Sequence, residues 1–108
     1  MTIITMTDDN WSDIVGKSDS LLVSFSSPHC PPCRAAEPVM EQLGQELADR
    51  LKVAKINVWE HSELASSLGI MATPTFVLFR GGEPTNKMVG YQSRDALFGT
   101  IQGWMDAK

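Results

Sequence analysis

The most informative part of this sequence is Ser27-Pro28-His29-Cys30-Pro31-Pro32-Cys33-Arg34, which contains the only two cysteines of the 108-residue chain. An apolar run of strand-forming residues, Leu21–Phe25, precedes it, and apolar residues at helical intervals follow it. If Cys30 begins a helix, Cys33 lies one turn further on, and the two sulfur atoms are close enough for a disulfide. A strand, a Cys-x-x-Cys turn and a helix in this order are typical of a thiol–disulfide redox site.

The length and composition predict a single soluble domain spanning residues 1–108. The chain is 43% hydrophobic and 20% charged, which is typical of a globular protein rather than a disordered one. Its net charge of −4, with no cationic cluster, argues against nucleic acid or an anionic membrane as a partner. No apolar run is long enough to span a membrane, and the N-terminus lacks the basic flank and apolar core of a signal peptide. We therefore expect a cytoplasmic protein.

Two other roles for the cysteine pair are less well supported. A structural disulfide is rare in the cytoplasm, and one across so short a loop would constrain the unfolded chain little. A metal site would need more ligands, because two thiolates supply half of a closed tetrahedral zinc shell. His29 could be a third ligand, but neighbouring residues seldom point at one metal. The sequence therefore favours redox chemistry, with no metal and no cofactor other than the disulfide itself.

The remaining pattern predicts alternating strands and helices. Thr7 is expected to cap a first helix that ends at Gly16, and Ser93 to cap the last one. Pro38 lies inside the helix after the cysteines, and Pro84 marks an edge strand. The expected strands are 2–6, 21–25, 52–58, 76–79 and 85–89, and the two middle helices are 33–50 and 62–68. A helix-length link between the second and third strands predicts a parallel, right-handed βαβ unit.

This order of elements, together with several motifs, resembles the thioredoxin family over essentially the whole chain. The motifs are Cys30-Pro31-Pro32-Cys33, Pro38, Lys55-Ile56-Asn57-Val58, Ala72-Thr73-Pro74-Thr75, Gly81-Gly82 and Val89-Gly90. The resemblance implies an α/β fold, the thioredoxin fold, with a central mixed β-sheet flanked by helices. It also implies a cis peptide bond between Thr73 and Pro74 that faces the cysteines.

The two cysteines are expected to have different roles. At a helix N-cap, Cys30 would face free backbone N–H groups and the positive end of the helix dipole, which favours its thiolate. Cys30 would attack a substrate disulfide, and the more buried Cys33 would resolve the mixed disulfide. The resemblance implies that a backbone groove binds the substrate segment as an added strand. The matching positions are Ala72, Thr73, Pro74, Val89, Gly90 and Tyr91.

The active-site environment is expected to comprise His29, Pro31, Pro32, Ser24 and Trp59. All of these except Pro32 depart from the family pattern, as does Ser26, which replaces a tryptophan. Pro31 replaces the usual glycine, which removes one N–H near Cys30 and stiffens the turn. Ser24 replaces the buried aspartate that usually accepts the proton of the resolving cysteine, and serine is no base near neutral pH. Lys55 would then be half-buried without its carboxylate. Either a neutral Lys55 or a water takes the Cys33 proton, or Lys55 merely extends to the surface.

Two further positions lie beside the site. His29 replaces a tryptophan and either stabilises the Cys30 thiolate when protonated or is an exposed residue without that role. Trp59 follows the third strand, where the family commonly has aspartate, and either covers the site or packs as an ordinary aromatic residue.

We expect a protein-disulfide reductase that works as a monomer. Because the chain has no nucleotide-binding glycine motif, a thioredoxin-reductase-like flavoprotein would supply its electrons. The alternatives are a disulfide oxidase or isomerase, a thioredoxin-fold binding module dedicated to one partner, and a metal or cluster bridged between two chains.

Overall fold

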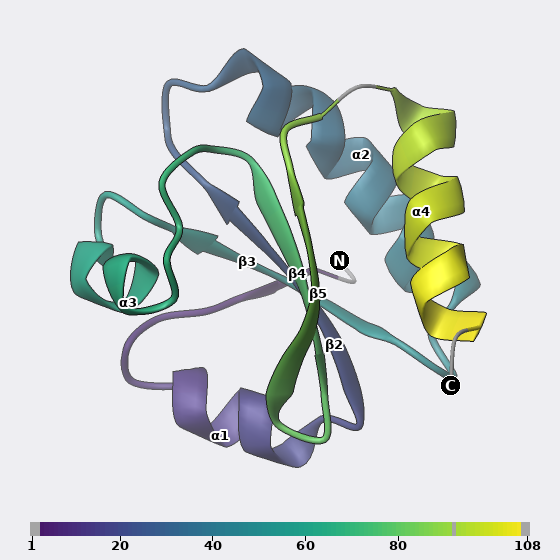
Figure 1. The fold of residues 1–108 in the computed structure, drawn as a ribbon, viewed down its shortest axis with the longest axis horizontal. Helices are drawn as coiled ribbons and strands as arrows, with labels where there is room; N and C mark the ends of the chain where they lie inside the picture. The colour runs from purple at the N-terminus through teal and green to yellow at the C-terminus, as the bar shows by residue number, and fades with distance from the viewer. Residues whose placement is uncertain (1–2, 92, 107–108) are drawn as a thin grey trace.

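A computed structural model describes residues 3–91 and 93–106 of the chain. Five strands form one sheet in the order β1-β3-β2-β4-β5, and helices cover both of its faces (Figure 1). The strands are β1 (Ile3–Thr5), β2 (Ser20–Ser26), β3 (Lys52–Asn57), β4 (Thr75–Arg80) and β5 (Glu83–Val89), and the helices are α1 (Trp11–Lys17), α2 (Pro31–Glu46), α3 (Ser62–Ser67) and α4 (Arg94–Asp106). The expected α/β architecture, a central mixed sheet flanked by helices, is confirmed.

The strand directions explain the patterns in the sequence. Strands β1, β3 and β2 run parallel, while β4 is antiparallel to β2 and β5 is antiparallel to β4. Strand β2 lies in the middle of the sheet, and its residues 21–25 are all buried, as their continuous apolar character predicts. Pro84 lies in the edge strand β5, where a residue without an N–H is tolerated.

The buried residues form two layers, one on each face of the sheet. Helices α2 and α4 cover one face, and α1 and α3 lie on the other (Figure 1). The layer under α2 and α4 includes Leu43, Phe76 and Ile101, all fully buried. Burial of this apolar surface is the main force that holds α2 against the sheet. The N-terminus of α2 carries the two cysteines, so this layer also fixes their position.

The first helix begins later than predicted. Its first residue is Trp11, and its N-cap, Asn10, makes no side-chain capping hydrogen bond. Thr7 instead forms two hydrogen bonds with Asn10 in the turn before the helix. The Asn10 N–H donates to Thr7 Oγ1 at 3.3 Å, and the Thr7 N–H donates to Asn10 Oδ1 at 2.7 Å. Thr2, the predicted start of the first strand, lies outside the described residues.

Two helix ends also differ from the prediction. Helix α1 continues through Gly16 to Lys17, so this glycine is an interior residue of the helix rather than its end. Helix α2 ends at Glu46 and not near Arg50, because Leu47 leaves the helical conformation with φ −111° and ψ 23°. Residues 47–50 form a turn instead. The Ala96 N–H donates to Ser93 Oγ at 3.1 Å, which confirms the predicted cap of α4.

Candidate active site

A disulfide joins Cys30 and Cys33 at the N-terminus of α2. Cys30 is the N-cap of the helix, which begins at Pro31 rather than near Cys33, and Cys33 lies in its first turn. The two Cα atoms are 5.2 Å apart, so the pairing expected from the spacing is confirmed. The exposed fractions of the two residues are 7% and 8%, so the expectation that Cys33 is the more buried of the two is wrong for this disulfide form.

The helix start offers the Cys30 sulfur few hydrogen-bond donors. Pro31 and Pro32 occupy the first two helical positions and carry no N–H. The Cys33 N–H donates to Cys30 Sγ at 3.3 Å, and the Arg34 N–H donates to the Cys30 carbonyl oxygen at 3.1 Å. Among residues 31–34, one backbone N–H therefore faces the sulfur, fewer than a helix N-terminus without prolines provides.

The segment before β4 lies against the same sulfur. The Thr73–Pro74 peptide bond is cis, as the family resemblance implies. The Thr73 hydroxyl donates to Cys30 Sγ at 3.6 Å and lies 3.2 Å from Ser27 Oγ. The Gly90 N–H donates to the Pro74 carbonyl oxygen at 2.8 Å, which joins the end of β5 to this segment. Of the predicted groove residues, the structure thus places Thr73 beside Cys30 and joins Gly90 to Pro74.

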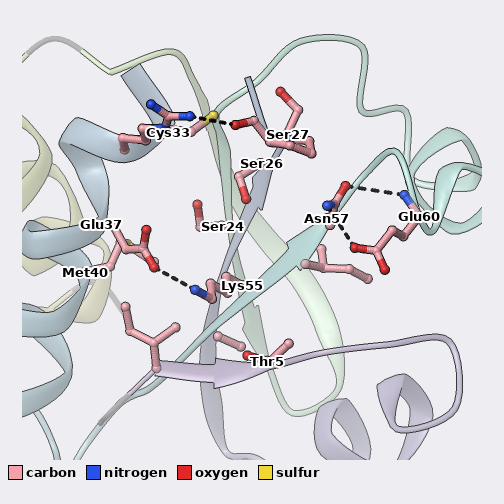
Figure 2. Close-up of a pocket in the computed structure, with 15 residues that line it drawn as sticks. Thr5, Ser24, Ser26, Ser27, Cys33, Glu37, Met40, Lys55, Asn57 and Glu60 are labelled. Carbon is pink, nitrogen blue, oxygen red and sulfur yellow. Dashed lines mark hydrogen bonds and ion pairs between the residues drawn. The ribbon is translucent and has the colours of Figure 1, made fainter. Parts of the chain in front are cut away.

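Cys33 also lines a cavity of about 440 Å³ (Figure 2). Its lining includes the polar side chains of Ser24, Ser26 and Lys55. Ser24 is 7% exposed and is the parallel-strand neighbour of Lys55. The position that usually holds an aspartate in the family is therefore occupied by a short hydroxyl side chain at the wall of this cavity.

Lys55 does have a carboxylate partner, so the expectation that it lacks one is wrong. Its Nζ lies 2.6 Å from Glu37 Oε1, and the two side chains are 34% and 46% exposed. Glu37 comes from α2, four residues after Cys33, and also lines the cavity. Residues four apart lie on the same face of a helix, and this spacing was the available signal for Glu37. The carboxylate is thus supplied by the helix rather than by β2.

An aromatic pair lies on the exposed side of the site. The ring centroids of His29 and Trp59 are 5.7 Å apart, with an interplanar angle of 60°. His29 is exposed and directly precedes Cys30, and the Trp59 side chain is 62% exposed. The Trp59 N–H donates to Asn57 Oδ1 at 2.8 Å, which anchors the loop after β3. Trp59 therefore lies beside the residue next to Cys30 and is not part of the core.

No group of three or more His, Cys, Asp or Glu side chains within residues 3–91 and 93–106 could hold a metal ion. In the same ranges, no helix has both the length and the apolar character needed to cross a membrane.

Comparison with known proteins adds to this geometry. The family model described as Thioredoxin matches residues 2–103. A thioredoxin of Alicyclobacillus acidocaldarius is 40% identical over 94 residues, which are 87% of this chain and 90% of that protein. The structure of a mutant thioredoxin from Halobacterium salinarum NRC-1 matches with a TM-score of 0.85 and 34% identity, covering 98% of this chain and 92% of that one.

A third relative has a different architecture. A bifunctional thioredoxin reductase/thioredoxin of Mycobacterium leprae is 34% identical over 95 residues, which are 87% of this chain and 21% of that protein. The sequence matched by this chain is thus a small part of that relative, whereas the match extends over nearly the full length of the other two.

Proposed function

This chain belongs to the thioredoxin family of dithiol–disulfide oxidoreductases, and from that premise we propose that it reduces protein disulfides, with Cys30 as the nucleophile and Cys33 as the resolving thiol. The Cys30 thiolate attacks a substrate disulfide, forms a Cys30–substrate disulfide and releases the first substrate thiolate. Cys33 then attacks Cys30 Sγ, which forms the Cys30–Cys33 bond and releases the second thiolate. Two electrons pass from the dithiol to the substrate, and no cofactor takes part.

The structure of the start of α2 supports a protein that donates electrons rather than accepts them. A strongly oxidising thiol pair is one whose reduced form is stabilised. Here the prolines at positions 31 and 32 remove two N–H groups that could stabilise the Cys30 thiolate, so the Cys33 N–H is the one backbone donor left at the helix start, beside the hydroxyl of Thr73. The reduced form is therefore less stabilised than at a helix start without prolines. This geometry favours a reductant over the oxidase or isomerase alternative.

The surface around Cys30 fits a protein substrate. The exposed large apolar side chains among the described residues are Trp59, Met71 and Val89, and each is a neighbour, in space or along the chain, of a predicted site residue. Trp59 contacts His29, Met71 is two residues before Thr73, and Val89 is the β5 neighbour of the first residue of β4. An extended substrate segment beside residues 72–74 would pair with the backbone and pack on this apolar rim.

The proposed partner on the electron-donating side is a thioredoxin-reductase-like flavoprotein. The Mycobacterium leprae relative unites a thioredoxin reductase and a thioredoxin in one protein, which supports this pairing. We propose further that residues 1–108 act as one monomeric domain in the cytoplasm, consistent with the single sheet. In line with the net charge of −4, we propose that this domain binds neither nucleic acid nor a membrane.

The test is reduction of insulin by catalytic amounts of this protein, with NADPH and a purified bacterial thioredoxin reductase as the electron source. We expect NADPH oxidation that depends on both proteins, and insulin reduction when dithiothreitol replaces the enzyme system. Reduction with dithiothreitol but none with NADPH would show that the flavoprotein partner is wrong. No reduction with either donor would contradict the reductase itself.

A further inference from the structure

The Lys55–Glu37 ion pair lies on the wall of the cavity that also contains Cys33, and this cavity has no role in the steps described so far. We propose that Glu37 accepts the Cys33 proton, through water in this cavity, when Cys33 resolves the mixed disulfide. The inference rests on the proposed order of attack, in which Cys33 is the resolving thiol. It differs from the alternatives left open by the sequence, in which a neutral Lys55 or a water takes this proton or Lys55 has no such role.

The position of Glu37 follows from the helix. Cys33 and Glu37 are four residues apart in α2, so they lie on the same face, with their Cβ atoms about 5–6 Å apart. Both side chains line the cavity. Figure 2 shows Glu37 and Lys55 pointing toward each other, with Glu60 near Asn57 on the opposite side. Glu37 is thus the carboxylate of α2 that lines the same cavity as the resolving Cys33.

The cavity can hold the water that such a transfer needs. Its volume of about 440 Å³ far exceeds the roughly 10–15 Å³ that one water requires, and hydroxyl groups of Ser24 and Ser26 line it. An aspartate in place of Ser24 would reach into this space from β2. Because serine is shorter and is no base, the acceptor must come from another segment, and Glu37 is the lining carboxylate on the same helix as Cys33.

The charged groups that face this space come from three segments. Lys55 on β3 holds the Glu37 carboxylate at 2.6 Å and fixes its position. Arg34 on α2 also lines the cavity, but its Nη2 donates to the Pro28 carbonyl oxygen at 3.2 Å. Glu60, after β3, accepts a hydrogen bond from Asn57 Nδ2 at 3.0 Å. Glu60 therefore provides a second carboxylate in the same cavity. It lies at the end of the cavity away from Glu37 (Figure 2) and is already hydrogen-bonded to Asn57.

The proposed step needs no reactant other than the mixed disulfide, Cys33, water and Glu37. The Cys33 S–H bond breaks, and its proton passes through water to a Glu37 carboxylate oxygen. The resulting Cys33 thiolate forms a bond to Cys30 Sγ, and the electron pair of the Cys30–substrate S–S bond leaves on the substrate sulfur. The proton on Glu37 then returns to that thiolate or to solvent.

The experiment follows the reaction of the reduced protein with excess Ellman's reagent in stopped flow, as a function of pH. The attack by Cys30 releases one coloured thiolate and the resolution by Cys33 releases the second, so the two steps are seen separately. The variants are Glu37→Gln, the matched control Glu60→Gln, and the double variant Ser24→Asp/Glu37→Gln, which returns a carboxylate to the cavity from β2.

We expect Glu37→Gln to slow the second phase near neutral pH by about 100-fold, the lower range for a positioned proton acceptor. The first phase and the Glu60→Gln protein keep the native rates. The deficit of Glu37→Gln should vanish above about pH 8.5, where a cysteine thiol ionises without help. The double variant should recover most of the lost rate.

An unchanged second phase in Glu37→Gln across the pH range would overturn the inference, as would an equal slowing at every pH, since that marks a structural effect. Failure of the double variant to recover rate while it remains folded by circular dichroism would also contradict it. Absence of the first phase in the native protein would instead contradict the role of Cys30, and with it the proposed function.

Discussion

A Cys30→Ser variant is expected to lose protein-disulfide reduction by roughly a thousandfold or more, because a serine hydroxyl is not ionised near neutral pH and cannot attack the substrate sulfur. Cys30 is the N-cap of α2, and a serine is a preferred residue at that position. The fold should therefore survive the substitution. The measurement is insulin reduction driven by dithiothreitol, with circular dichroism as the check on folding.

The matched variant is Cys33→Ser, which keeps the nucleophile and removes the resolving thiol. It should also stop turnover, but it should accumulate a covalent mixed disulfide with the substrate that mass spectrometry detects and reductant releases. Cys30→Ser should form no such adduct. If instead the adduct formed through Cys33 in Cys30→Ser, the assigned roles would be reversed. If Cys30→Ser retained full biological activity, the chain would be a binding module rather than a reductase.

The second large effect concerns the layer that positions α2. Replacing Phe76 with alanine is expected to lower the free energy of unfolding by about 3–5 kcal/mol, from lost apolar burial and from the cavity left behind. Phe76 is fully buried in β4, in the cluster that includes Met40 and Leu43 of α2. Since domains of this size are stable by about 5–15 kcal/mol, the variant should be close to unfolding. Chemical denaturation measures the change.

The control for this prediction is Glu46→Ala, an exposed position at the end of α2, where the change should stay within about 0.5 kcal/mol. A loss of less than about 1 kcal/mol in Phe76→Ala would mean that this ring is not part of a tightly packed layer. In that case the account of how α2 is held on the sheet would need revision.

The sequence predicted the parts of the site that depend on local signals. The apolar strand before Cys30 and the helical spacing of apolar residues after Cys33 place the pair at a helix start, and both are local patterns. The continuous apolar run 21–25 predicts a central strand, and Pro84 predicts an edge strand, because each follows from the hydrogen bonds and burial of its own segment. The cis bond before Pro74 followed from the family resemblance and is present.

The parts that were missed depend on contacts between distant segments. Lys55 and Glu37 are 18 residues apart, and their pairing depends on the rotation of α2 relative to β3. The expectation placed the missing carboxylate on β2, at Ser24, and so overlooked one on the facing helix. The contact between His29 and Trp59 likewise joins two loops. The end of α2 was misplaced because Leu47 leaves the helix without a glycine or proline to mark it, and the end of α1 because Gly16 lies inside that helix.

The equilibrium redox potential of the Cys30–Cys33 pair, measured in glutathione and dithiothreitol buffers, tests the central claim most directly. The helix start with its two prolines stabilises the thiolate weakly, so the dithiol should give up its electrons readily. We predict a potential below the cytosolic glutathione poise of about −220 to −260 mV, as a reductant requires. A potential at or above that poise would contradict the reductase and would instead support oxidation or isomerisation.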